Sequence, residues 1–360
     1  MYVKKEATMR IAYSCAGEGL GHAVRTSVIG PLLERRHRIV YFAPSTVEAF
    51  LRSKMGNRKF EGIPHFAFEK RGEKVLILAS LIRSIPAMLR LSYTILLFAR
   101  RLRELRIDAV ISDFEPILPR AARLLGIPVF QLNHPGIVQR VERAHPLRWL
   151  TSFASRVLEG PWHERIHISF YHGDVGPILR REIFRHPTKD GGFILLNLKP
   201  SYRPAIIPIL DRLGKAYRLF PNKDEVFEEA FASCSCVISS AGHQIIAESI
   251  ALNKPILVIP QRGQWEQRLN AEMIALTGKG MATSMKRLEG DLRVFLGKLE
   301  AYRGHALPSR FDVSDNSAKI ARRIEKFLAG YCARRRGWTI RGAGASYTIR
   351  AKTVAPRRAS

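Results

Sequence analysis

Residues 238–271 read ISSAGHQIIAESIALNKPILVIPQRGQWEQRLNA, and this stretch decides the fold. An apolar run ends in the small turn Ser240-Ala241-Gly242, a helical run follows from His243, and PILVIP returns as a second strand. The free N–H groups at the start of that helix would suit a diphosphate. Beyond PILVIP lies a polar cluster that we expect to bind hydroxyl groups, formed by Gln264, Glu266, Gln267 and Asn270.

The same alternation extends along the chain in both directions. The second half also holds FILLNL and AYRLF, and the first half holds MRIAYSC, RIVYFA, DAVISD and IPVFQL, with helix-sized segments between them. Short β-branched runs alternating with helices predict an α/β fold with parallel sheets and right-handed crossovers. We expect two Rossmann-like domains facing a central cleft, an N-terminal one over 9–175 and a C-terminal one over 190–330. The Gly- and Pro-rich stretch 171–192 is the expected hinge.

The segment AGEGLGHAVRT, residues 16–26, lies between the first strand and the first helix. Gly17, Gly19 and Gly21 let the backbone turn tightly and leave space for a ligand, while His22 opens the helix. The G-x-G-x-G spacing differs from the dinucleotide fingerprint, so NAD is not expected. A strand-to-helix turn with an incidental histidine is the structural alternative.

The segment DAVISDFEP, residues 108–116, places Asp113 directly after a strand. Because the carboxyl ends of parallel strands face one crevice, Asp113 and His22 can meet there. A carboxylate beside an imidazole fixes its tautomer and stabilises the protonated ring, as a general base requires. Glu115 is a competing candidate, and helix capping before Pro116 is the structural alternative for both acids.

Three motifs, taken in their order along the chain, resemble those of a known family. The chain resembles nucleotide-sugar glycosyltransferases of the GT-B fold, near the peptidoglycan N-acetylglucosaminyl transferase and the UDP-glycosyltransferases, and most of all the glycosyltransferase family 28-like proteins. The motifs are G-x-G-L-G-H-x-x-R at 17–25, S-D-F-E-P at 112–116 and G-Q-x-E-Q-x-x-N-A at 263–271. Matching segments are spread over residues 10–285.

The resemblance implies an inverting hexosyltransferase that moves a sugar from a nucleotide donor, expected to be a UDP-sugar, to an acceptor hydroxyl. It implies a lipid-linked or cell-envelope acceptor and neither a metal nor another cofactor. His22 would deprotonate the acceptor with Asp113 behind it, and the glycine loop and Glu115 would border the acceptor. The donor would be held at the diphosphate by Gly242 and His243, at the ribose by Glu248, and at the sugar by Gln264, Glu266 and Gln267. One departure is Ser240, where plant and animal UDP-glycosyltransferases have a histidine.

The composition of the chain indicates its binding partners more than its fold. The 360 residues include 59 Lys and Arg against 31 Asp and Glu, a formal net charge of +28. With 46% hydrophobic residues the chain is not of the disordered or collagen-like class. The excess of basic residues favours nucleic acid, an anionic membrane surface or a phosphate-bearing substrate as partner. Four scattered cysteines, Cys15, Cys234, Cys236 and Cys332, and an N-terminus without an apolar signal core predict a cytoplasmic protein.

Residues 163–167 spell His-Glu-Arg-Ile-His, the pattern of a zinc site. That site needs a helix so that both histidines share one face. The alternating IHISF that follows predicts a strand instead, so we expect no metal here.

Two segments depart from globular composition. Residues 75–106 are apolar but interrupted by arginines, and the longest uncharged run among them, 91–99, is too short to cross a bilayer. This segment would lie in a membrane interface, at the inner face of the cell membrane, or else cover a sheet face. Residues 333–360 contain eight Lys or Arg and no acid, which predicts a disordered basic arm.

Two rival functions stay open at the level of sequence. A nucleotide-sugar 2-epimerase would have the same fold and would turn over its sugar without an acceptor. A non-enzymatic nucleic-acid-binding protein would use the basic charge together with Trp338 and Tyr347. We favour the nucleotide sugar, the hydroxyl acceptor and the anionic membrane surface as partners, and not nucleic acid.

Overall fold

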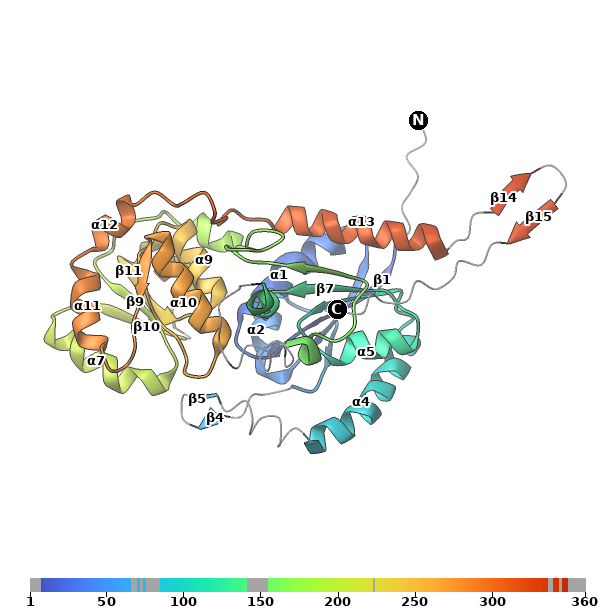
Figure 1. Cartoon of the computed structure of the whole chain (residues 1–360), viewed down its shortest axis with the longest axis horizontal. Helices are drawn as coiled ribbons and strands as arrows, with labels where there is room; N and C mark the ends of the chain where they lie inside the picture. The colour runs from blue at the N-terminus through green and yellow to red at the C-terminus, as the bar shows by residue number, and fades with distance from the viewer. Residues whose placement is uncertain are drawn as a thin grey trace.

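Two parallel sheets, each between two layers of helices, form the fold (Figure 1). The computed structural model describes residues 8–65, 70–71, 74–75, 85–140, 155–222, 224–335, 339–342 and 345–348. All nine expected strands are present, the run IHISF included, and each of the two large sheets contains only parallel pairs. The α/β prediction with two parallel-sheet domains is therefore confirmed.

The first sheet has the strand order β3-β2-β1-β6-β7-β8. Its strands are β1 (Arg10–Cys15), β2 (Arg38–Ala43), β3 (Phe60–Gly62), β6 (Ala109–Asp113), β7 (Val129–Asn133) and β8 (Glu164–His167). The helices of this domain are α1 (Gly21–Glu34), α2 (Ser45–Met55), α4 (Ile85–Glu104) and α5 (Ile117–Leu124), with the short 3-10 helix η1 (Pro135–Gln139). Alternate residues of β1 enter opposite cores: Ile11 and Tyr13 pack toward α1, and Ala12 packs toward α4 and α5.

The second sheet has the strand order β10-β9-β11-β12-β13. Its strands are β9 (Ile194–Asn197), β10 (Tyr217–Phe220), β11 (Cys236–Ser240), β12 (Ile256–Ile259) and β13 (Gly280–Ala282). The helices around it are α7 (Arg203–Arg212), α8 (Phe227–Ser233), α9 (His243–Ala251), α10 (Trp265–Thr277), α11 (Leu288–Leu296) and α12 (Leu299–Gly304), with the 3-10 turns η2 (Arg181–Arg185) and η3 (Pro200–Tyr202). In β11, Val237 and Ile238 again enter different cores, so both faces of this sheet are covered.

Helix α13 (Ser317–Arg335) lies on the first domain, although we placed residues up to 330 in the second. Its apolar face, including Ile320, Ile324 and Phe327, belongs to the same core as Ile11 and Tyr13 of β1. The chain therefore crosses between the domains twice, once through the expected hinge and once before α13. The second crossing was not predicted, because an amphipathic helix does not show which apolar face it will cover.

The tail differs in part from the expected disordered arm. Helix α13 continues through Arg335, and β14 (Thr339–Gly342) pairs antiparallel with β15 (Ala345–Thr348). Ile340 lies opposite Tyr347 in the register of this pair, whereas the basic composition predicted no regular structure here. Trp338 and residues 349–360 lie outside the described residues.

The arginine-rich segment 75–106 is described from 85 onward as α4, and Arg83 lies outside the described residues. A two-residue pair, β4 (Lys70–Arg71) with β5 (Lys74–Val75), precedes it. Ala99 and Leu102 of α4 are buried against the first sheet, so the helix does cover a sheet face. Within the described parts of the chain, no helix is long and apolar enough to span a membrane.

The His-Glu-Arg-Ile-His segment forms strand β8 and not a helix. His163 and His167 consequently do not have the one-turn helical spacing that a zinc site of this type needs. The Nδ1 atom of His163 accepts a hydrogen bond from the backbone N–H of Val129. The sequence prediction of a strand is confirmed here.

Helix α13 should contribute to the stability of the first domain. Replacing Ile324, which is fully buried, with alanine should lower the free energy of unfolding by about 2–5 kcal/mol, because it leaves a cavity in the core. Denaturant unfolding measures the change. Lys326→Ala on the exposed face is the control and should change it by no more than about 0.5 kcal/mol. Equal effects of both variants would show that α13 does not pack as described.

Candidate functional site

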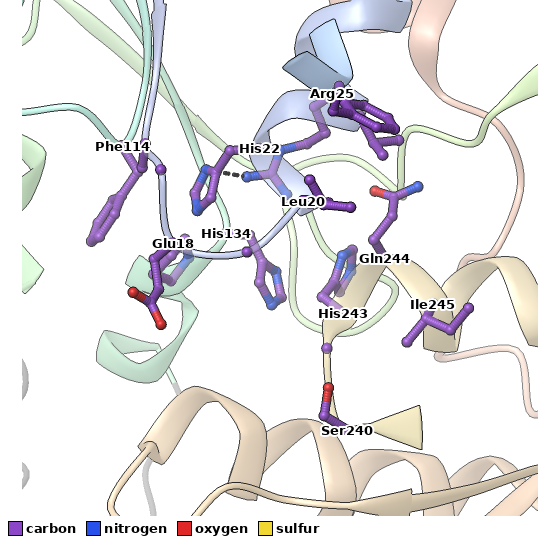
Figure 2. A pocket seen from close by; sticks show the side chains of 18 of the residues that line it. Glu18, Leu20, His22, Arg25, Phe114, His134, Ser240, His243, Gln244 and Ile245 are labelled. Atoms are coloured by element: carbon purple, nitrogen blue, oxygen red, sulfur yellow. Dashed lines mark hydrogen bonds between the residues drawn. The ribbon is translucent and has the colours of Figure 1, made fainter. Parts of the chain in front are cut away.

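A cavity of about 900 Å³ lies between the two domains. The first domain lines it with the glycine loop and with residues that follow β6 and β7, and the second lines it with the turn before α9 and the loop before α10. Figure 2 shows side chains of both domains around this space. The cavity lies at the carboxyl ends of strands in both sheets, where parallel sheets gather their loops.

The glycine loop needs its glycines for two different reasons. A Cβ atom on Gly17 would lie 2.6 Å from Oγ1 of Thr46 and 2.7 Å from Nδ1 of His65, so the backbone passes too close to its neighbours for a side chain. Gly19 has φ +74°, a left-handed conformation that glycine adopts without strain. Gly21 begins α1, and the turn brings His22 to the cavity wall.

His22 and Asp113 meet as expected, 91 residues apart in sequence. Nδ1 of His22 lies 2.8 Å from Oδ1 of Asp113. Arg25 of the same helix binds both carboxylate oxygens, with Nε 2.8 Å from Oδ2 and one Nη 2.8 Å from Oδ1. Asp113 is completely buried, and burial alone would raise its pKa; Arg25 and His22 outweigh burial and hold the pKa at about 2. The carboxylate is therefore ionised beside the imidazole.

Phe114, directly after Asp113, occupies an uncommon backbone conformation. Its φ is +58°, which is strained for a bulky residue. The ring stacks on His22 with 6.2 Å between centroids and also lines the cavity. The strained turn thus places an aromatic face against the imidazole.

Glu115 caps a helix, which is the structural alternative that the sequence left open. Its carboxyl accepts hydrogen bonds from the backbone N–H groups of Ile117 and Leu118, the latter at 3.0 Å. Burial raises its pKa to about 7, against the lowering effect of these two donors. Glu115 lines the cavity, but its carboxyl is engaged by the first N–H groups of α5.

The N-terminus of α9 opens on the cavity at Gly242 and His243. Nε2 of His243 accepts a hydrogen bond from the backbone N–H of Phe170, so the neutral ring carries its proton on Nδ1. That Nδ1 is buried and has no hydrogen-bond partner among the described residues. Burial, followed by the nearby His134, lowers the pKa of His243 well below its usual value. His243 is thus a neutral donor whose capacity is unused.

The loop before α10 brings three of its predicted side chains to the cavity, those of Gln264, Glu266 and Gln267. Gln264 lines the cavity, and its buried Oε1 has no partner within the described structure. Glu266 lies with Oε1 3.4 Å from Nε2 of His134. Burial would raise the pKa of Glu266, but His134 together with His22 and Arg25 outweighs burial and lowers the pKa. Gln267 also lines the cavity, and its Oε1 accepts the backbone N–H of Gln261, which braces the loop.

Asn270, the fourth member of the predicted polar cluster, is fully buried. It accepts a hydrogen bond from the hydroxyl of Tyr171 and donates one to the carbonyl of Ala241 at 3.0 Å. It supports the turn before α9 and has no surface on which a ligand hydroxyl could dock. For Asn270 the hydroxyl-binding prediction is wrong.

The expectation that Glu248 faces the ribose disagrees with the structure. Glu248 is completely buried and forms a two-oxygen ion pair with Arg180, whose Nε lies 2.8 Å from Oε1. Gln244 and the backbone N–H of Arg180 donate to the same carboxylate. In this arrangement the carboxylate is occupied by Arg180, and Arg180 itself lines the cavity.

The comparisons with known proteins now bear on this geometry. The model of the family described as glycosyl transferase family 1 matches residues 9–300, which spans both sheets and the whole cavity. The chain belongs to this family. It is a glycosyltransferase. No curated protein matches the chain.

Solved structures share the fold of this glycosyltransferase. The glycosyltransferase of kitacinnamycin superposes with a TM-score of 0.59 at 15% identity, over 89% of this chain and 99% of that one. MurG of Acinetobacter baumannii gives 0.52 at 15% identity, over 88% and 99%. The UDP-GlcNAc 2-epimerase of Neisseria meningitidis, bound to UDP-GlcNAc, gives 0.54 at 12% identity, over 89% and 100%. These likenesses confirm the predicted GT-B fold.

Arg25 and Arg180 are among the residues of the glycosyltransferase cavity that were not predicted as site residues, and His134 was predicted only as an alternative base, next in line with Glu115. Arg25 had a readable signal, because it follows His22 by three residues on a helix and so shares its face. His134 stacks on His243 with 3.8 Å between ring centroids and donates from Nδ1 to the carbonyl of Ile168. Its position directly after a strand was a weaker signal. Nothing local in the sequence pairs Arg180 with Glu248.

Glu115 should make the stability of the enzyme depend on pH. Its folded pKa of about 7 exceeds the unfolded value of about 4.3, so the folded state holds a proton that the unfolded state has released. This stabilisation is complete below the unfolded pKa and is lost as the pH rises through about 7, a change of about 4 kcal/mol.

Unfolding free energies of the wild type and of Glu115→Gln, measured at about pH 5 and about pH 7.5, test this expectation. The wild type should lose more stability than the variant over that interval, because the other titrating groups are common to both. The same slope in both proteins would contradict the raised pKa.

Proposed function

We propose that this glycosyltransferase inverts the anomeric centre as it moves a sugar from a UDP-sugar to an acceptor hydroxyl. One observation carries the proposal: an imidazole paired with an ionised carboxylate and a helix N-terminus with an unused imidazole N–H line one cavity, and they come from different domains. The first group suits proton removal, and the second suits a departing diphosphate. Figure 2 shows His22 and His243 around this space, with His134 also drawn.

The reaction would be one displacement at the anomeric carbon. Nε2 of His22 takes the proton of the acceptor hydroxyl while the acceptor oxygen bonds to the anomeric carbon. The bond from that carbon to the diphosphate oxygen breaks, and its electron pair leaves with the diphosphate. Asp113 stabilises the imidazolium that forms, since it stays ionised. Attack opposite the leaving group inverts the configuration.

The charge that develops on the diphosphate would meet groups that are already in place. The free backbone N–H groups at the start of α9 and the Nδ1–H of His243 would donate to its oxygens. Because His243 is neutral and buried, it would donate without first changing its protonation state. Gln264 and Glu266, on the neighbouring loop, would bind hydroxyl groups of the donor sugar.

A lipid-linked acceptor at the inner face of the membrane is the second part of the proposal. Helix α4 buries Ala99 and Leu102, whereas Tyr93, Leu96 and Leu97 are exposed. Arg100 and Arg103 extend the helix beyond this apolar patch and are exposed as well. Apolar side chains beside arginines suit the interface of an anionic membrane.

His22→Gln should lower kcat by roughly 10²–10⁴-fold, because it removes the base, while the affinity for UDP stays nearly unchanged. Initial rates with a UDP-sugar and a soluble acceptor give kcat, and calorimetry gives the affinity. Full activity of the variant would show that the base lies elsewhere. Sugar turnover by the wild type in the absence of an acceptor would instead favour the 2-epimerase.

The membrane proposal is tested by flotation with liposomes that contain anionic lipid. Combined substitution of Leu96 and Leu97 by serine and of Arg100 and Arg103 by glutamine should reduce the floated fraction several-fold, because both apolar and ionic contacts are lost. The control is the pair Leu276→Ser and Val294→Ser, two exposed apolar residues on helices of the other domain. Equal flotation of the α4 variant and the wild type would remove the membrane surface from the proposal.

A further inference from the structure

Arg25, His22 and Asp113 form a closed triangle inside the first domain. Nδ1 of His22 lies 2.8 Å from Oδ1 of Asp113, the Nη2 atom of Arg25 lies 2.8 Å from that same oxygen, and Nη2 lies 2.8 Å from Nδ1. All three residues are buried. Figure 2 shows His22 and Arg25 joined across one side of this triangle.

The triangle cannot hold three hydrogen bonds at once. A guanidinium only donates and a carboxylate only accepts, so Nδ1 of His22 would need a lone pair for Arg25 and a proton for Asp113. Arg25 directs Nε–H and one N–H of Nη2 to the two oxygens of Asp113 in the bidentate arrangement, and the second N–H of Nη2 is the bond that could reach Nδ1 of His22. With three equal sides, Oδ1 and Nδ1 lie about 60° apart as seen from Nη2, whereas its two N–H bonds diverge by about 120°, so a straight bond to Oδ1 leaves only a bent, weak contact with Nδ1. The proton therefore belongs on Nδ1, donating to Asp113.

We propose that Arg25 is a positioning residue that fixes the tautomer of His22 by holding Asp113 as an ionised, correctly oriented acceptor. The proton is then kept on Nδ1, and Nε2 keeps its lone pair toward the cavity. This inference rests on the proposed function only where it treats Nε2 as the base; the tautomer itself is a property of the resting protein.

Removing Arg25 should reverse the arrangement. Without Arg25, only His22 would offset the effect of complete burial on Asp113. The pKa of Asp113 would therefore rise. A protonated Asp113 donates and does not accept, so Nδ1 would become the acceptor and the ring proton would move to Nε2. The lone pair that takes the acceptor's proton would be lost, although His22 itself is unchanged.

The first test reads the tautomer by ¹⁵N NMR of the histidine rings in the full chain, with the His22 signals assigned by their loss in His22→Gln. The wild type should show a protonated Nδ1 and an unprotonated Nε2. Arg25→Met should show the Nε2-protonated form, and Arg25→Lys, which keeps the charge, should retain the wild-type form. An Nε2-protonated ring in the wild type would overturn the proposal even if Arg25→Met does not fold.

The second test is a double-substitution cycle on kcat with Asp113→Asn. Arg25→Met should lower kcat at least about tenfold in the wild type and less than about threefold when residue 113 is already asparagine, because Arg25 acts through that carboxylate. The KM of the Arg25→Met variant for the UDP-sugar should stay nearly unchanged. Arg52→Met is the control, since Arg52 pairs with Glu48 on the surface of α2. Equal losses in both backgrounds would contradict the positioning role.

The two tests separate this proposal from the proposed function. A wild-type His22 with the Nδ1 proton, together with the tautomer change in Arg25→Met, supports the positioning role even if UDP-sugars are not substrates. If UDP-sugars are substrates but the tautomer does not respond to Arg25, the positioning role is wrong and the transferase assignment stands.

Discussion

Parallel strand direction is the constraint on which the cavity depends. Each strand of a parallel sheet delivers its following loop to the same edge, so residues from distant parts of the chain gather there without contacts between their helices. The glycine loop after β1 and Asp113 at the end of β6 meet for this reason. The turn after β11 and the loop after β12 meet for the same reason in the other domain. One geometric rule, applied twice, produces both walls of the cavity.

Charges in the cavity are arranged so that few remain unbalanced. Asp113 is neutralised by Arg25, Glu248 by Arg180, and Glu228 by Lys54 of the other domain at 2.7 Å. A buried charge without a partner is costly, so these pairs limit which groups can change protonation during a reaction. Four imidazoles line the cavity among the described residues, those of His22, His65, His134 and His243, and of these we assign the proton to His22 and the anion to His243. The pairing of these acids with Arg or Lys thus holds their charges fixed and leaves other side chains to take part in the reaction.

The sequence predicted the fold and the first-domain site better than the second-domain site. The strands were readable because buried parallel strands are short β-branched runs, and His22 with Asp113 followed from the strand-end rule. Glu248 was assigned through resemblance, and no sequence pattern reveals that Arg180, 68 residues earlier, reaches its carboxylate. The hydroxyl-binding prediction for Asn270 was wrong for a similar reason. The sequence of a polar loop does not show whether a given polar side chain supports the turn or faces a ligand. Long-range partners of buried polar groups are set by tertiary packing, which local patterns do not contain.

The return of α13 to the first domain also has a consequence for synthesis of the chain. Its residues Ile320 to Leu328 complete the core that contains Met9 and Ile11, so segments that precede and follow the second domain in the chain share one apolar layer. The first domain must keep that face uncovered while the entire second domain is translated. The second domain needs no such late segment for its two cores. The cores of the second domain can therefore form before α13 has been synthesised, whereas the core of the first domain is completed only by α13.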